Sequence, residues 1–298
     1  MDWDLPQLQA LAGAVAEGSF EAAARRLHVT PSAISQRIKA LETSVGRVLL
    51  IRSRPVRPTE SGEALLRLAR QIEVLTEEAS RSLAQEEAED LPVVALAVNA
   101  DSLATWLPAA LAAVNPPVCF DLRRADETRT AELLRDGTVT AAVTALADPV
   151  PGCSASSLGY MRYRPRAAPE FVARWFADGV TAATLARAPV VVYDRTDVLQ
   201  DRYLARRSRR RLRPPRHHVP GSWAFTEAVW LGLGWGMVPD LQAGQRAGLV
   251  ELDPGGAVDV HLHWQQWRLR SATVERVAEA VRARAAGVLL EAPSARAT

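Results

Sequence analysis

The fold of the N-terminal region is decided by residues 20–43, FEAAARRLHVTPSAISQRIKALET. Ser19 offers a hydroxyl cap to a helix over Phe20–Leu27, whose alanines let another helix approach closely. Thr30-Pro31 then supplies a second cap, followed by proline at the first helical position, where its missing N–H costs nothing. We therefore predict a second helix over Ser32–Thr43, separated from the first by a short turn.

The flanking residues complete a small domain around this helix pair. Leu5, Leu8, Leu11, Ala12 and Val15 recur at helical spacing before Gly18-Ser19, which predicts a preceding helix. After Gly46, the apolar run Val48–Ile51 leads into the basic, proline-containing stretch Arg52–Pro58, which is typical of a hairpin wing. We predict a winged helix-turn-helix over residues 1–58.

The polar side of the last helix and the wing carry groups that suit duplex DNA. Glutamine pairs with adenine edges, arginine with guanine or phosphate, and a helix N-terminus favours phosphate. Residues 21–59 hold eight basic and two acidic residues, whereas the whole chain has a formal net charge of only +2. The alternative is a three-helix bundle with a solvated, arginine-rich face. The candidate DNA-binding residues are Thr30, Pro31, Ser32, Ser35, Gln36, Arg37, Lys39, Arg52, Arg54 and Arg57.

Three segments make the interpretation specific. Residues 20–27, 31–42 and 57–62 resemble the DNA-binding end of LysR-type transcription regulators. The resemblance implies that the partners are double-stranded promoter DNA and RNA polymerase. One departure is Leu50, where many members carry phenylalanine, and this change affects packing rather than groove contacts.

Length and composition agree with such a regulator. At 298 residues the chain fits two or three domains, and it has no apolar run near the roughly 18 residues that a membrane span needs. The acidic start Met1-Asp2-Trp3-Asp4 lacks the features of a secretory signal, so we expect a cytoplasmic protein with no membrane partner. Cys119 and Cys153 show no metal-ligand spacing, and we expect both to be buried thiols.

A long amphipathic helix follows the wing. Residues 60–84 contain no proline and place Leu65, Leu68, Ile72, Leu75, Ala79 and Leu83 at helical spacing. A helix standing away from its own domain cannot bury this stripe alone, so we expect a homodimer, and the resemblance implies a dimer of dimers. The alternative is that the stripe packs against the C-terminal domain. The linker and dimerisation segment is predicted to span residues 59–90.

Residues 91–298 alternate strands and helices, which predicts an α/β domain with a mostly parallel sheet. The strands near Ser156–Arg166 and Val258–Leu269 cross between two lobes, and a helix over Thr273–Leu290 closes the first lobe. The predicted fold class is thus α/β, with an N-terminal α-helical winged helix-turn-helix and a C-terminal two-lobed, periplasmic-binding-protein-like effector domain. Lobe 1 covers about 91–163 and 267–298, and lobe 2 covers about 164–266.

The effector site is expected between the lobes, where strand ends meet helix starts. A carboxylate fits the helix start at Asn99–Ser102, and a cationic group needs acidic side chains. Asp101 could instead merely cap its helix, and Asp126 and Glu127 could be solvated first-turn acids. The candidate effector-binding residues are Asn99, Ala100, Asp101, Ser102, Asp126, Glu127, Thr128, Thr144, Asp194, Ser222 and Trp223.

Four further segments resemble one branch of the family, the regulators of lysine and arginine export of the LysG and ArgP type. They are residues 99–106, 126–130, 188–191 and 232–239. The resemblance implies a sensor of a basic amino acid, namely lysine, arginine or histidine, that controls an exporter gene and uses no cofactor. Pro220 and Trp223 stand where those regulators carry more polar residues. A different small carboxylate with a metabolic operon as target stays open, as do an enzyme and a solute-binding protein.

Several weaker signals do not change this interpretation. Gly232–Gly236 lacks the context of a nucleotide loop, and we expect it to be a turn into a short strand. His261 and His263 share a strand face but have no third metal ligand. Arg206–Arg216 could touch nucleic acid, but we favour a solvated helix end and loop. No serine, histidine, aspartate or cysteine set has catalytic spacing, so we predict no enzyme.

Overall fold

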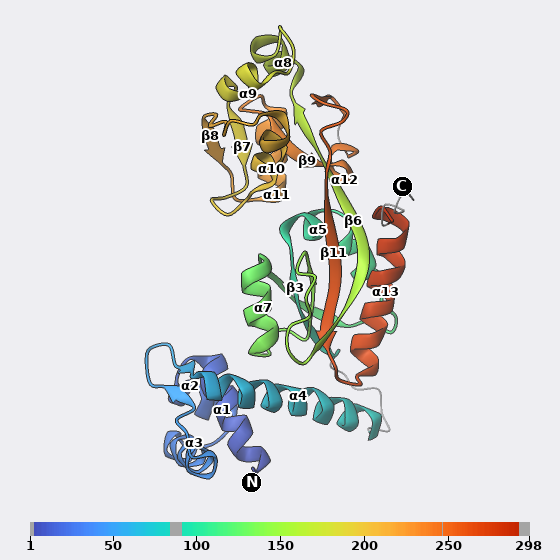
Figure 1. The fold of residues 1–298 in the computed structure, drawn as a ribbon. Helices are drawn as coiled ribbons and strands as arrows, with labels where there is room; N and C mark the ends of the chain where they lie inside the picture. The colour runs from blue at the N-terminus through green and yellow to red at the C-terminus, as the bar shows by residue number, and fades with distance from the viewer. Residues whose placement is uncertain (1–2, 84–90, 246, 292–298) are drawn as a thin grey trace, which may run out of the picture.

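The computed structural model describes residues 3–83, 91–245 and 247–291. Figure 1 shows three parts in succession: a helical N-terminal domain at one end, a central α/β lobe, and a second lobe at the far end. A long helix, α4 (Glu60–Leu83), leaves the N-terminal domain and runs beneath the central lobe. Nothing among the described helices is long and apolar enough to cross a membrane.

The helix-turn-helix forms as its capping residues predict. Helices α1 (Leu5–Glu17), α2 (Phe20–Arg26) and α3 (Pro31–Val45) pack around one apolar core. The Ser19 hydroxyl accepts from the amide of Ala22 at 3.1 Å, and the Thr30 hydroxyl accepts from the amide of Ala33 at 3.2 Å. The predicted helix starts are confirmed, and α3 continues two residues beyond the expected Thr43.

The wing is a two-stranded antiparallel hairpin. Strand β1 (Leu50–Ile51) pairs with β2 (Arg57–Pro58), so residues 52–56 form the tip. The Glu42 carboxylate accepts from the Leu49 amide at 2.8 Å and thereby ties α3 to the start of the wing. Leu49 itself is fully buried in the core. The orientation of the wing relative to α3 is therefore fixed by buried contacts.

Gly62 lets α4 lie directly against the wing. The Thr59 hydroxyl caps α4 by accepting from the Gly62 amide at 3.1 Å, and the Thr59 amide donates to the Leu49 carbonyl at 2.9 Å. A Cβ atom on Gly62 would lie 2.0 Å from that Leu49 carbonyl oxygen. Only glycine fits this position, which explains its place in the Arg57–Gly62 segment.

We therefore expect Gly62→Ala to lower the free energy of unfolding by about 1–3 kcal/mol, because backbone must move away from the new methyl group. Denaturant unfolding of the full chain measures this change. Gly287→Ala in the last helix is the matched control, since a Cβ there meets nothing within 4 Å. Equal unfolding midpoints for the two variants would contradict the packing argument.

Helix α4 contacts both the N-terminal domain and the C-terminal domain. Leu65, Leu66 and Ala69 are buried in the core of the N-terminal domain. Further along, the Arg70 guanidinium donates to the Asp136 carbonyl at 2.8 Å, and the Glu78 carboxylate accepts from the Ala272 amide at 2.7 Å. The helix therefore packs partly against its own C-terminal domain, as the alternative prediction held, and does not stand apart.

The central part of the molecule is a seven-stranded sheet with the order β10-β6-β11-β5-β3-β4, in which β9 also pairs with β6. Its strands are β3 (Val93–Val98), β4 (Cys119–Arg124), β5 (Ala141–Thr144), β6 (Cys153–Ala167), β9 (Gly236–Pro239), β10 (Val250–Glu251) and β11 (Val258–Trp267). Only β3, β4 and β5 pair in parallel. The expectation of a mostly parallel sheet is wrong, because the long strands β6 and β11 run antiparallel through both lobes.

Short helices cover this sheet. In the central lobe they are α5 (Ala100–Ala104), α6 (Leu107–Ala112), α7 (Glu127–Arg135) and α13 (Ala272–Val288). The second lobe adds the parallel pair β7 (Val190–Val192) and β8 (Arg216–His218). Its helices are α8 (Pro169–Trp175), α9 (Ala182–Arg187), α10 (Leu199–Arg207), α11 (Ser222–Trp230) and α12 (Asp240–Ala243).

Two expectations about the central lobe are corrected. The helix predicted to start at Asn99–Ser102 is two helices, α5 and α6, with a break at Thr105-Trp106. The break directs the Trp106 ring inward, where its N–H donates to the buried Ser102 hydroxyl at 3.1 Å. Cys119 is exposed, because β4 is an edge strand of the sheet, whereas Cys153 is buried.

Candidate functional site

The first candidate surface lies on α3 and the wing. Pro31, Ser32, Gln36 and Lys39 are exposed, and Ser35 and Arg37 are half-buried beside them, while the opposite side of α3 buries Ile34, Ile38 and Leu41. Thr30 and the wing residues Arg52, Arg54 and Arg57 are also exposed. The structure thus places all ten candidate residues within the winged domain, and none of them is needed for its apolar core.

This surface has the chemistry of a groove reader. The Thr30 and Ser32 hydroxyls lie 2.9 Å apart at the N-terminus of α3, where the helix presents unbonded N–H groups. The exposed amide of Gln36 and the half-buried guanidinium of Arg37 follow within two turns, at the spacing that reaches base edges from a helix in a major groove. The wing arginines are placed to meet phosphates, which fix position but carry no sequence information.

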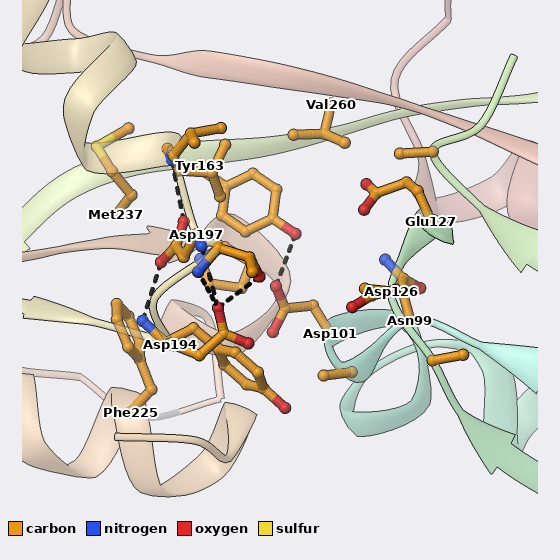
Figure 2. Close-up of a pocket in the computed structure, with 18 of the residues that line it drawn as sticks. Asn99, Asp101, Asp126, Glu127, Tyr163, Asp194, Asp197, Phe225, Met237 and Val260 are labelled. Atoms are coloured by element: carbon orange, nitrogen blue, oxygen red, sulfur yellow. Dashed lines mark hydrogen bonds between the residues drawn. The ribbon is translucent and has the colours of Figure 1, made fainter. Parts of the chain in front are cut away.

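The second candidate site is a cleft of about 780 Å³ between the two lobes. The central lobe contributes Asn99, Ala100 and Asp101 from the start of α5, and Asp126 and Glu127 from the start of α7. The far lobe contributes Asp194 and its neighbours, and the crossing strands contribute Tyr163 and Val260. Figure 2 shows these groups converging from both sides.

Asp101 is the polar centre of the cleft. Its carboxylate accepts a hydrogen bond from the buried Tyr163 hydroxyl at 2.7 Å and another from the Ser222 hydroxyl. Asp101 belongs to the central lobe and Ser222 to α11 of the far lobe, so this carboxylate joins the two lobes. The alternative that Asp101 only caps its helix is wrong, because the residue at the cap position is Asn99, which makes no side-chain cap bond.

Burial raises the pKa of Asp101 above its ordinary value, and the nearby Asp197 carboxylate raises it further, while the hydrogen bonds from Ser222 and Tyr163 act in the opposite direction. Burial and the Asp101 charge raise the pKa of Tyr163 well above its ordinary value. Tyr163 is therefore a neutral donor. A cation entering the cleft would favour the ionised form of Asp101.

A chain of buried polar groups lies behind Asp101. The Gln242 amide donates to the Ser222 hydroxyl at 2.8 Å, and the Gln242 carbonyl oxygen accepts from the Thr226 hydroxyl at 2.7 Å. Ser222 and Gln242 are almost fully buried. Because each partner of this chain is satisfied by the next, the Ser222 hydroxyl is oriented toward Asp101.

The far lobe presents two ordered carboxylates. Asp194 accepts from the amide and hydroxyl of Thr196, both at 2.7 Å, and Asp197 accepts from the amides of Tyr193 and Leu199 at 2.9 and 3.0 Å. Partial burial of Asp194 raises its pKa, but the hydrogen bonds from Thr196 outweigh that effect and the net pKa is lowered. Both side chains are thus held in place before any ligand arrives.

Asp126 has two roles. Its carboxylate accepts from the Arg129 amide at 2.8 Å and caps α7, and it also lines the cleft beside Glu127. Both residues are exposed. Water therefore screens their charges, and we expect them to attract a cation more weakly than Asp101 does.

Five predicted residues do not line the cleft. Ser102 and Thr144 are buried, and their hydroxyls accept from Trp106 and from the Leu146 amide. Ser222 lies behind Asp101 and acts on it. Thr128 and Trp223 are exposed elsewhere, because one step along a helix turns a side chain by about 100° away from its neighbour.

The cleft also contains residues that sequence reasoning missed. They are Arg124, Tyr163, Tyr193, Asp197, Gln200, Arg202, Phe225 and His261. Arg124 ends strand β4, and its position at a strand end could have revealed it. Tyr163 and His261 lie within the crossing strands, and nothing in the local sequence tells which face of those strands meets the cleft.

The charge balance of the cleft favours a cation. Its lining includes the carboxylates of Asp101, Asp126, Glu127, Asp194, Asp197 and Asp259 against the guanidiniums of Arg124, Arg129 and Arg202. Among the described residues, the guanidiniums of Arg124 and Arg202 have no hydrogen-bond or ion-pair partner, so they can meet a carboxylate. The side-chain carbonyl oxygens of Asn99 and Gln200, which also line the cleft, are buried and have no hydrogen-bond partner among the described residues. These oxygens need N–H donors.

Two known protein families match the chain. Residues 5–63 match the family described as bacterial regulatory helix-turn-helix protein, lysR family, and residues 87–286 match the LysR substrate binding domain. The chain belongs to the lysR family of bacterial transcription regulators.

The chain is similar to regulators of one branch of this family. It is 45% identical to the HTH-type transcriptional regulator LysG of Mycobacterium tuberculosis, over 96% of this chain and 94% of that protein. It is 46% identical to the lysine export transcriptional regulatory protein LysG of Corynebacterium efficiens, over 92% and 95% of the two chains.

Solved structures show the same similarity. The crystal structure of ArgP from Mycobacterium tuberculosis matches with a TM-score of 0.90 at 44% identity, over 96% of this chain and 99% of that chain. Full-length LysG from Corynebacterium glutamicum with bound effector Arg matches with a TM-score of 0.81 at 38% identity, over 96% and 99%. The predicted resemblance to the LysG and ArgP branch is confirmed.

Proposed function

We propose that this regulator senses a basic amino acid in the cleft between its lobes and controls transcription of an amino-acid exporter gene. The observation that carries the proposal is the excess of carboxylates around a cleft that spans both lobes, with Asp101 at its centre. The similar LysG from Corynebacterium glutamicum holds arginine as its effector, and two similar regulators are named for lysine export. The chain is inferred to act by binding and not by catalysis.

The proposed ligand matches the cleft group by group. Its cationic side chain meets the carboxylates, and its α-carboxylate meets Arg124 or Arg202. N–H groups of the ligand satisfy the oxygens of Asn99 and Gln200. Because these partners come from both lobes, the ligand stabilises one angle between them, and α4 carries the change to the winged domain.

Calorimetric titration of the purified chain with arginine, lysine and histidine tests this assignment. Citrulline is the matched control for arginine, since it keeps the length and replaces the charged guanidinium by a neutral ureido group. Binding of at least one basic amino acid with citrulline at least about tenfold weaker, a loss of about 1.4 kcal/mol, is expected. Equal binding of citrulline and arginine would overturn the cation assignment, and a different carboxylate would then be sought.

Effector affinity is expected to fall on acidification, and to begin falling above the pH range of an ordinary aspartate. The raised pKa of Asp101 means that it takes up a proton earlier than an exposed carboxyl, and the protonated form no longer attracts a cation. Calorimetry at a series of pH values measures the effect. Asp101→Asn is the control. This variant should bind the effector more weakly, and its affinity should no longer fall in the pH range where Asp101 takes up a proton. A pH profile equal to that of the wild-type protein would contradict the role of Asp101.

We further infer that the chain works as a homodimer and as a dimer of dimers. Leu75 and Leu83 of α4 remain 41% and 81% exposed, which leaves an apolar strip for a second copy. Leu75→Lys is expected to shift the mass measured by light scattering toward the monomer, whereas Arg81→Ala on the same helix should not. The same dimeric mass for both variants would place the interface elsewhere.

The remaining assignments follow from the family. We propose promoter DNA, contacted by the ten residues of α3 and the wing, and RNA polymerase as the partners, with the cytoplasm as the place of action. We propose the division into a DNA-binding domain over 1–58, a linker over 59–90 and an effector domain over 91–298. The candidate effector residues Asn99, Ala100, Asp101, Asp126, Glu127 and Asp194 stay as proposed contacts, with Ser222 positioning Asp101.

A further inference from the structure

One segment of the far lobe carries a denser positive charge than the winged domain. Residues 199–218 hold eight arginines and a single acidic residue, Asp201, a formal excess of seven, while the whole chain carries only +2. The remainder of the protein is therefore net negative. Of these eight arginines only Arg202 lines the cleft, and all of them lie in the lobe away from the winged domain. Neither DNA reading by α3 nor effector binding therefore accounts for the other seven.

Apart from Arg202, which lies in α10 and lines the cleft, the arginines of this segment form two groups. Arg206 donates to the Ala257 carbonyl at 2.9 Å, Arg207 lies 3.3 Å from the Asp253 carboxylate, and Arg216 pairs with Asp201. These three hold the lobe together. The others occupy the loop between α10 and β8, are exposed, and have no side-chain partner among the described residues; they are Arg209, Arg210, Arg211 and Arg213.

The loop is anchored at several points. The Ser208 hydroxyl accepts from the Arg210 amide at 3.1 Å, Leu212 packs against the core, and Pro214 is buried. The exposed arginines are thus presented on a fixed base. No exposed aromatic or large aliphatic side chain lies among residues 208–213.

We propose that this arginine loop, residues 208–213, is a second, sequence-independent contact with duplex DNA. A protein partner would need apolar anchors at the centre of its interface, and the loop offers none. DNA phosphates are bound by cations that donate hydrogen bonds, and the four guanidiniums of this loop, which have no partner among the described residues, supply them. In Figure 1 the loop joins α10 to β8, in the lobe at the opposite end of the molecule from α3. It therefore contacts DNA away from the groove that α3 of the same chain reads.

The test compares Arg209→Gln/Arg210→Gln/Arg211→Gln/Arg213→Gln with a control of equal charge, Arg135→Gln/Arg187→Gln/Arg282→Gln/Arg284→Gln, whose side chains are exposed elsewhere. Binding of each full-length protein to the DNA upstream of its own gene, and to a shuffled duplex of equal length, is measured over a range of salt concentrations. The loop variant is expected to have a weaker salt dependence on both duplexes. The magnitude of the slope of log affinity against log salt should decrease by up to about 3.6, or about 0.9 for each lost phosphate contact.

Equal slopes for the loop variant and its control, on both duplexes, would overturn the proposal. Equal slopes together with loss of transcription activation in a purified system would also overturn it, and would assign the loop to an acidic protein surface. A slope change on the upstream duplex alone would contradict a sequence-independent contact. Because these measurements need no effector, their failure leaves the proposed amino-acid sensing untouched.

Discussion

Asp101→Asn is expected to weaken binding of arginine or lysine by about 100-fold or more, which corresponds to about 3 kcal/mol. The substitution keeps the size of the side chain and an oxygen that accepts from Tyr163 or Ser222. It removes the negative charge at the point where both lobes meet. A large loss of affinity with little loss of stability is therefore the predicted result, measured by calorimetry and by thermal unfolding of the same sample.

The matched control is Asp126→Asn. Asp126 lines the same cleft with the same charge but is exposed and already caps α7. Its loss should change effector affinity by no more than about fivefold, since exposed charges contribute about 1 kcal/mol or less. Equal effects of the two substitutions would show that the cleft attracts cations by its general field, and the central role of Asp101 would be abandoned.

Gln36→Ala and Arg37→Ala are each expected to cost about 1–3 kcal/mol of specific DNA binding, or about 5- to 150-fold, while binding to shuffled DNA changes less. Gln36 is exposed on the side of α3 opposite the buried Ile34 and Ile38, and Arg37 is half-buried beside it. Competition between the upstream duplex and a shuffled duplex measures the loss of discrimination directly.

The wing provides the contrasting variant. Arg54→Ala should weaken binding to both duplexes alike and lower the salt slope by about 0.9, because a phosphate contact carries no sequence information. Arg54 is exposed at the tip of the hairpin. If Gln36→Ala and Arg54→Ala reduced binding to the two duplexes in the same ratio, the assignment of base reading to α3 and backbone contact to the wing would be wrong.

Local signals predicted the winged domain well. Its helices begin at Ser19 and Thr30 caps, which act over three residues and are visible in the sequence. The effector domain was predicted in outline, because alternating apolar runs mark strands. The mixed parallel and antiparallel sheet was not predicted, because the direction of β6 and β11 depends on which lobe each strand enters and not on its own residues.

The cleft was predicted only where it consists of residues that follow strand ends. Asn99, Asp101 and Asp126 follow strand ends, and they were predicted because ligands of α/β domains bind where strands end. Tyr163, Tyr193 and Arg202 reach the cleft from a crossing strand, a loop and the middle of a helix, and only the assembled lobes bring them together. The link from Asp101 to Ser222 joins residues 121 positions apart, beyond any local pattern.

The most direct test of effector control is a footprint of the purified protein on the DNA upstream of its own gene, with and without the amino acid that calorimetry identifies. We expect the effector to shift the footprint or the affinity of the wild-type protein, and we expect Asp101→Asn to bind the DNA but no longer respond. Effector that occupies the cleft and leaves both footprint and transcription unchanged would contradict the coupling between cleft and winged domain.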